Sequence, residues 1–149
     1  MPSVSVVLPI YNNAHYLDEC LSSVMNQTMQ DLEIICVNDG STDGSLEIIQ
    51  RYAAADERFI VIDKPNTGYG NSMNVGCDLA TGEYLTVLES DDIFPLDACE
   101  TMYRFAKDNG DLDFLKADAQ MFFGVGDERR FEYLPASENT HCYEGVFDS

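Results

Sequence analysis

Short apolar runs alternate with polar turns and amphipathic segments from the start of the chain, and this order constrains the fold most. Four runs rich in β-branched residues are too short for buried helices: Val4 to Leu8, Leu32 to Val37, Phe59 to Ile62 and Tyr84 to Leu88. Continuously apolar runs are typical of strands covered on both faces. The repeated order of strand, turn and helix predicts parallel strands joined by crossover helices.

Apolar residues recur at helical spacing after each of these runs. In the first stripe, Leu17, Leu21 and Val24 follow Asn12 and Asn13, which can cap a helix. The sequence therefore predicts one helix after each strand. The later stripes are Leu46, Ile49 and Ala53; Met73, Cys77 and Ala80, stopped by Gly82; and Cys99, Met102 and Ala106, closed by Asn109 and Gly110.

The pattern weakens after residue 110. Phe114 to Phe123 mixes polar and apolar side chains, which favours an exposed or edge strand. The last ~25 residues show no clear period, so we expect loop or partial strand there. The sequence contains neither an internal repeat nor a linker, and residues 1–149 are expected to form one domain.

Composition restricts the partners of the chain. It holds 27 Asp and Glu against 8 Lys and Arg, a formal net charge of −19. Such a chain lacks the basic surface that nucleic acid or an anionic membrane requires, although a divalent cation could bring an anion to it. The sequence shows no secretory signal, no membrane span and no CxxC pair among its five cysteines. We therefore expect a soluble cytoplasmic protein with reduced cysteines.

Polar residues directly follow three of the four predicted strands, in segments 9–12, 38–40 and 89–92. The carboxyl ends of parallel strands meet at one edge of a sheet, and ligands collect there near a switch in strand order. We therefore expect the functional site at this edge.

The acidic segment after the fourth strand indicates a metal site. Glu89, Asp91 and Asp92 place three carboxylates within four residues, where they repel one another. Mg²⁺ or Mn²⁺ relieves this repulsion, because either ion takes one or two carboxylates together with phosphate oxygens and water. The plainer alternative is a solvated acidic turn that caps the helix after Pro95.

Two further segments favour nucleotide binding. Asp39 lies between a strand and a glycine-rich turn, where its carboxylate can accept hydrogen bonds from a base or ribose; an Asx turn is the alternative. Gly68 and Gly70 let backbone N–H groups approach an anion at the next helix. The sequence matches neither a P-loop nor the GxGxxG fingerprint, so no motif favours binding of ATP or NAD.

Four segments carry a sequence pattern in fixed order and spacing. They read SVVLPIYN at 5–12, LEIICVNDGSTD at 32–43, N-x-G followed by NVG and ATGEY within 66–84, and LESDD at 88–92. Together they resemble the N-terminal half of family-2 glycosyltransferases over about residues 3 to 100. The resemblance implies a GT-A fold, which is a Rossmann-like α/β three-layer sandwich with a mostly parallel central sheet. It also implies inverting transfer from a nucleotide-diphosphate sugar, often UDP-linked.

The resemblance assigns roles to residues of the first three segments. Pro9 and Tyr11 match positions that line the nucleobase pocket, and Asp39 matches the carboxylate that reads uracil. The other nucleotide-sugar contacts that it implies are Gly68, Gly70, Asn74, Glu89 and Ser90.

The fourth segment matches the DxD motif of the family. The resemblance places Asp91 on Mg²⁺ or Mn²⁺ and residue 89 near the ribose, with Asp92 as an extension. Glu89 replaces the usual Asp and is one methylene longer, so we do not expect it to be a direct metal ligand. Met73 replaces an Arg found in many members, which leaves more of the diphosphate charge to the metal and to backbone N–H groups.

The resemblance also sets expectations for the whole protein. The general base of the family lies well downstream of DxD, so we expect it beyond Ser149 and the domain to be truncated on its C-terminal side. The chain should then bind nucleotide with a cation but transfer sugar poorly. The implied partners are a nucleotide-sugar donor and a sugar or lipid-linked acceptor in polysaccharide or glycolipid synthesis. Any attachment to the inner face of the membrane would use parts outside this chain.

Two other functions stay open at this point. One is a nucleotide-sugar-binding module without catalytic activity. The other is an acidic phospho-receiver-like domain, which needs a phospho-acceptor Asp at the end of its third strand, where Asp63 stands, and a Lys at its fifth.

Overall fold

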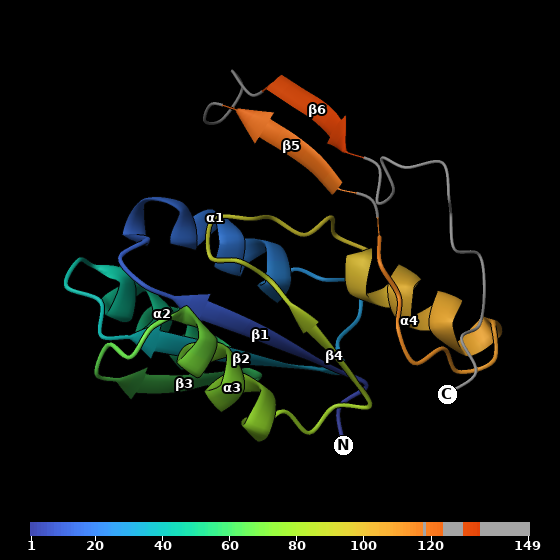
Figure 1. The fold of residues 1–149 in the computed structure, drawn as a ribbon, viewed down its shortest axis with the longest axis horizontal. Helices are drawn as coiled ribbons and strands as arrows, with labels where there is room; N and C mark the ends of the chain where they lie inside the picture. The colour runs from blue at the N-terminus through green and yellow to red at the C-terminus, as the bar shows by residue number, and fades with distance from the viewer. Residues whose placement is uncertain (118, 124–129, 135–149) are drawn as a thin grey trace. The chain divides into compact units, whose positions relative to one another are not determined.

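The computed structural model describes residues 1–117, 119–123 and 130–134 (Figure 1). The chain divides into two compact units, Met1–Tyr103 and Arg104–Ser149. The first unit contains all of the segments from which a functional site is predicted.

Four parallel strands form the sheet of the first unit: β1 (Val4–Ile10), β2 (Leu32–Asp39), β3 (Phe59–Lys64) and β4 (Tyr84–Val87). Their order in the sheet is β3-β2-β1-β4. Val7 of β1 lies opposite Ile35 of β2 and, on its other side, opposite Val87 of β4. The parallel sheet predicted from the alternation of strands and helices is confirmed.

All four predicted helices are present: α1 (Ala14–Met25), α2 (Ser45–Ala55), α3 (Tyr69–Leu79) and α4 (Ala98–Asp108). Apolar residues of α1 and α2 pack with one face of the sheet, whereas α3 packs with the other, which gives three layers. None of the helices in the described part of the chain has the length and apolar character that a membrane span requires.

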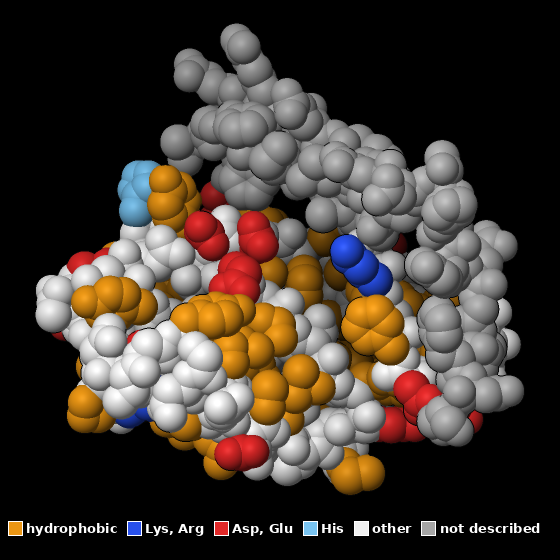
Figure 2. Space-filling model, viewed as in Figure 1, with side chains coloured by type: hydrophobic (Ala, Val, Ile, Leu, Met, Phe, Trp, Pro, Cys, Tyr) orange, Lys and Arg blue, Asp and Glu red, His pale blue; other side chains and the backbone are white. Residues whose placement is uncertain are grey.

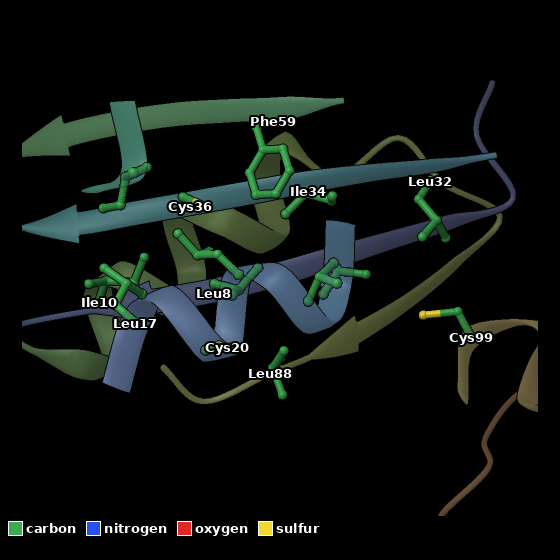
Figure 3. Close-up of a cluster of buried hydrophobic side chains, with 14 of the residues drawn as sticks. Leu8, Ile10, Leu17, Cys20, Leu32, Ile34, Cys36, Phe59, Leu88 and Cys99 are labelled. Carbon is green, nitrogen blue, oxygen red and sulfur yellow. The ribbon is translucent and has the colours of Figure 1, made fainter. Parts of the chain in front are cut away.

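Strand β1 supplies side chains to both hydrophobic clusters, and all seven of its residues are buried. Leu8 and Ile10 join the larger cluster with Leu17 and Cys20 of α1 (Figure 3). Val7 points to the opposite face and joins the smaller cluster under α3. Full burial of each such aliphatic side chain stabilises the fold by about 1.5–3 kcal/mol. Because β1 is covered on both faces, it reads as a continuous apolar run rather than an alternating one.

The first strand is longer than the predicted run from Val4 to Leu8, because β1 continues through Pro9 to Ile10. Leu88 N donates to Val7 O at 3.0 Å, so Val7 directs its backbone groups toward β4. The backbone N–H and C=O groups of residues two apart in a strand point to the same side. Pro9, which has no N–H, therefore directs its nitrogen toward the region just past the end of β4. Proline costs no ladder hydrogen bond at that place.

The apolar stripe predicted for α3 differs from the face that is buried. Cys77 is exposed, whereas Ser72 and Gly76 are buried. A Cβ built on Gly76 would overlap Val7 Cγ1, so the helix approaches the sheet more closely than a larger residue allows. Periodicity of apolar residues misses this contact, because its key residue has no side chain.

The second unit contains the last residues of α4 and an antiparallel pair of strands, β5 (Ala119–Phe123) and β6 (Arg130–Leu134). The strand predicted from Phe114 is shorter, since Phe114 lies outside β5 and is 80% exposed. Strand β6 lies in the segment without a clear period, although its first four residues alternate between charged and aromatic side chains. The remaining residues of that segment, 125–129 and 135–149, lie outside the described residues.

The close contact between α3 and β1 predicts a stability effect. Gly76→Ala should lower the free energy of unfolding by about 1–3 kcal/mol, because the added methyl group overpacks against Val7. Gly70→Ala is the matched control on the same helix, since nothing lies within 4 Å of its Cβ position. Urea denaturation measures both variants. Equal stability of the two would contradict the packing argument.

Candidate functional site

The turns after β1, β2 and β4 meet at the carboxyl edge of the sheet. β4 lies on the opposite side of β1 from β2 and β3, so the strand order switches between β1 and β4. Asn13, after β1, donates from Nδ2 to Ser90 Oγ at 2.7 Å, after β4. On the other side, Asn12 Oδ1 accepts from Thr42 N at 2.7 Å. The predicted convergence of these polar segments is therefore observed, at the switch point itself.

Asn13 stands at the N-cap of α1, but its side chain makes no capping hydrogen bond. Asp43 supplies the cap from the turn after β2, because its Oδ2 accepts from Ala14 N at 3.0 Å. Its Oδ1 accepts from Ser45 N, also at 3.0 Å, at the start of α2. Capping by Asn12 or Asn13 is thus replaced by a cap across strands, which frees Asn13 to bind Ser90.

Asp39 is the last residue of β2, and only 3% of it is exposed. Its Oδ1 accepts from Thr67 N at 2.8 Å and from the Lys64 ammonium group, and its Oδ2 accepts from Gly68 N at 2.9 Å. The alternative of an Asx turn is wrong for Asp39, because its partners are the last residue of β3 and the loop that follows β3. A carboxylate offers about four acceptor positions, and three are filled, so one position remains on Oδ2.

Gly40 allows this arrangement. Its φ is +67°, and a Cβ at that position would lie 2.7 Å from Asn66 N. Both the left-handed conformation and the close approach of the next loop therefore require glycine directly after Asp39.

Burial alone would raise the pKa of Asp39. The hydrogen bonds from Lys64, Thr67 and Gly68, together with the charge of Lys64, outweigh burial and hold the pKa below its ordinary value. Asp39 is therefore an ionised and rigidly held acceptor at neutral pH.

The acidic segment follows β4, in the region of Figure 2 where acidic side chains gather. Ser90 is buried, whereas Asp91 and Asp92 are exposed and accept no hydrogen bond from any described residue. Partial desolvation and the neighbouring charges of Asp91 and Glu89 raise the pKa of Asp92. The predicted repulsion among these carboxylates is thus present.

Capping of α4 does not use the acidic segment. Gln27, which is 1% exposed, accepts from Cys99 N through Oε1 at 3.0 Å and donates from Nε2 to Pro95 O at 2.6 Å. The start of α4 is thereby held by the segment that follows α1, and the carboxylates of Asp91 and Asp92 remain available to a ligand.

The described residues bring no three Asp, Glu, His or Cys side chains close enough to form a metal site by themselves. An exposed pair of uncompensated carboxylates nevertheless suits a hard cation that takes its other ligands from phosphate oxygens and water. The donor set therefore fits Mg²⁺ or Mn²⁺ bound together with a diphosphate.

Glu89 is held by α3. The Tyr69 hydroxyl donates to Glu89 Oε1 at 2.5 Å, and this bond is the main reason why the pKa of Tyr69 is raised. Beneath the segment, Cys20 Sγ donates to Glu89 O at 3.5 Å. Burial, with Asp92, Asp91 and Glu89 nearby, raises the pKa of Cys20 to about 12, so it stays a neutral core thiol.

The remaining predicted residues lie on the same elements. Pro9 is buried in β1, and Tyr11, just past the strand, is 52% exposed. Gly68 precedes α3 with a φ of +90°, and nothing lies within 4 Å of its Cβ position or that of Gly70. Asn74 is exposed on α3. Their roles toward a ligand stay predictions.

Sequence reasoning missed Lys64, Tyr69 and Asn13. Lys64 could have been found, because Asp39 and Lys64 end neighbouring strands and are register partners. Opposite charges at the ends of two adjacent parallel strands suggest an ion pair. Tyr69 and Asn13 carried no such signal, since neither can form an ion pair with a residue of a neighbouring strand; their partners, Glu89 and Ser90, lie in the turn after β4.

The fold is an α/β domain with a parallel sheet, and its candidate site lies at the switch point on the carboxyl edge of that sheet. Residues 5–138 match the model of glycosyl transferase family 2, and the chain belongs to this family. This places it among glycosyltransferases rather than phospho-receivers. Glycosyltransferase GlyA of Streptococcus pneumoniae is 30% identical over 98% of this chain.

Solved structures agree with the GT-A fold. Staphylococcus aureus TarS in complex with UDP has a TM-score of 0.67 and 28% identity over 72% of this chain and 32% of its own. The mannosyltransferase PcManGT of Pyrobaculum calidifontis, with GDP-Man and Mn²⁺, has a TM-score of 0.62 and 27% identity over 71% of this chain and 32% of its own. The chain spans 22% of GlyA and about a third of two further curated relatives.

The paired carboxylate of Asp39 predicts a pH-dependent stability effect. Asp39→Asn should lower the free energy of unfolding by about 3 kcal/mol at pH 7, because it leaves Lys64 buried without its counter-charge. The folded-state pKa of Asp39 is depressed, so its stabilising contribution is complete above the unfolded pKa and disappears as pH falls through the folded value. The deficit of the variant should therefore shrink on acidification.

Denaturant titrations of wild type and Asp39→Asn between pH 7 and pH 3 measure this deficit. Asp78→Asn removes an exposed carboxylate on α3 and serves as the control, with little effect at either pH. A deficit of Asp39→Asn that does not change with pH would show that the charge of Asp39 is not what stabilises the loop.

Proposed function

We propose that this protein contributes the donor-binding part of an inverting glycosyltransferase that uses a nucleotide-diphosphate sugar, with UDP as the nucleotide. The observation that carries the proposal is the pairing, at one switch point, of a buried acceptor at Asp39 with exposed carboxylates at Asp91 and Asp92. Asp39 would recognise the nucleobase, and the exposed carboxylates would attract the cation that a diphosphate needs. Neighbouring structures with UDP and with GDP-Man and Mn²⁺ support this choice of ligand class.

The nucleobase would be read by Asp39. The open acceptor position on Oδ2 suits the N3–H of uracil, since the carboxylate is held ionised by three donors of the protein. Tyr11 is half-exposed beside this edge and can cover a planar base, with Pro9 behind it in β1.

The diphosphate would lie between α3 and the acidic segment. No side chain caps the N-terminus of α3, so its backbone N–H groups and the open positions at Gly68 and Gly70 can face an anion. Asp91 would hold Mg²⁺ or Mn²⁺, with Ser90 fixed beneath it by Asn13. The bound cation supplies Lewis-acid stabilisation of the negative charge that develops on the departing diphosphate. With Met73 in the place of a cationic residue, the protein leaves this neutralisation largely to the cation.

Inversion at the anomeric carbon needs a general base for the acceptor hydroxyl. We assign no described residue to this role and propose that the base lies outside residues 1–149. Residues 1–149 would then belong to a single GT-A domain, with a sugar or lipid-linked acceptor in cell-surface polysaccharide or glycolipid synthesis on the cytoplasmic side. The isolated chain should bind the donor nucleotide but transfer sugar poorly.

Calorimetric titration of UDP with and without Mn²⁺ tests the proposal. Wild type should bind UDP more tightly with Mn²⁺ present, and Asp91→Ala should lose at least about tenfold of this enhancement, because it removes the metal-binding carboxylate. Asp78→Ala changes the net charge equally but lies on the exposed face of α3, so it should keep the enhancement. Unchanged Mn²⁺ dependence in Asp91→Ala would reduce the acidic segment to a solvated turn.

A further inference from the structure

The loop between β3 and α3 is tied to two carboxylates on different strands. Thr67 and Gly68 donate their backbone N–H groups to Asp39, the last residue of β2. The next residue, Tyr69, donates its hydroxyl to Glu89, after β4. Three consecutive residues therefore link the two acidic groups that flank the end of β1.

Only the Tyr69 side chain makes the second of these links. Tyr69 is the first residue of α3 and is 55% exposed, so the rest of its ring contributes little to the core. Its hydroxyl occupies Oε1 of Glu89, and the described residues offer no other hydrogen bond to that carboxylate. The direction of the Glu89 side chain is thus set by α3 and not by its own turn.

We propose that Tyr69 is a positioning residue that holds the longer Glu89 side chain toward α3 and the nucleoside, so that Glu89 serves the ribose and Asp91 remains the carboxylate ligand of the cation. This inference rests on the proposed function. Glutamate at residue 89 has one methylene more than aspartate, so a free Glu89 side chain would have more rotamers to lose when it binds the ribose. The Tyr69 hydroxyl selects the orientation that faces α3, and it occupies one of the acceptor positions of Glu89.

UDP titration with and without Mn²⁺ also tests this role. Tyr69→Phe should weaken UDP binding by about three- to tenfold in both conditions, which corresponds to the loss of one hydrogen bond. The ratio of the two dissociation constants should stay as in wild type, because the ribose contact does not involve the cation. Tyr16→Phe is the matched control: Tyr16 is 46% exposed, and its hydroxyl carries no hydrogen bond to a described residue.

A double-mutant cycle on Tyr69 and Glu89 distinguishes positioning of Glu89 from a structural role of Tyr69 that does not act through Glu89. In Glu89→Asp the shorter carboxylate cannot reach the hydroxyl, so adding Tyr69→Phe should change UDP affinity no further. Additive losses in the double variant, or a changed Mn²⁺ ratio in Tyr69→Phe, would overturn the role of Tyr69 while leaving the proposed function intact. Wild type that fails to bind UDP would refute both, and thermal unfolding of each variant shows whether an affinity loss reflects misfolding.

Discussion

The buried carboxylate of Asp39 is the interaction on which the carboxyl edge of the sheet depends. A buried charge without partners is destabilising by several kcal/mol, so Asp39 requires Lys64 and the N–H groups of Thr67 and Gly68. Meeting this requirement folds the loop after β3 back over the end of β2. That fold in turn brings Tyr69 within reach of Glu89, so one buried charge organises both sides of the site.

Around this fixed edge the chain leaves a second set of carboxylates uncompensated. Asp91 and Asp92 are exposed, and the pKa of Asp92 is raised by partial desolvation and by the charges of Asp91 and Glu89. The buried carboxylate of Asp39 and the exposed carboxylates of Asp91 and Asp92 thus suit different ligands. Asp39 is satisfied by the protein and can recognise a neutral polar partner, whereas the exposed pair suits a cation that arrives with an anionic ligand.

Prediction from sequence succeeded where a pattern is local and failed where a partner is distant. The four parallel strands and their helices follow from apolar runs and helical stripes, and the predicted convergence of polar turns at the carboxyl edge of the sheet is observed. The predicted cap of α1 is wrong, because the actual cap, Asp43, accepts its hydrogen bond from the N–H group of Ala14, 29 residues away in sequence. The first strand runs two residues past the predicted Leu8, because β4 ends opposite Val7 and the missing N–H of Pro9 costs no ladder hydrogen bond there.

The sequence by itself determined the order of strands and helices, the glycines of the turns and the acidic types of the site residues, because these depend on periodicity and on local chemistry. Tertiary structure alone decided which donors satisfy each carboxylate. Lys64 and Tyr69 became part of the site only through the parallel pairing of β2 with β3 and the packing of α3 across β1 and β2. The physical reason is that hydrogen bonds and ion pairs act over a few ångströms in space, and the distance along the chain says nothing about them.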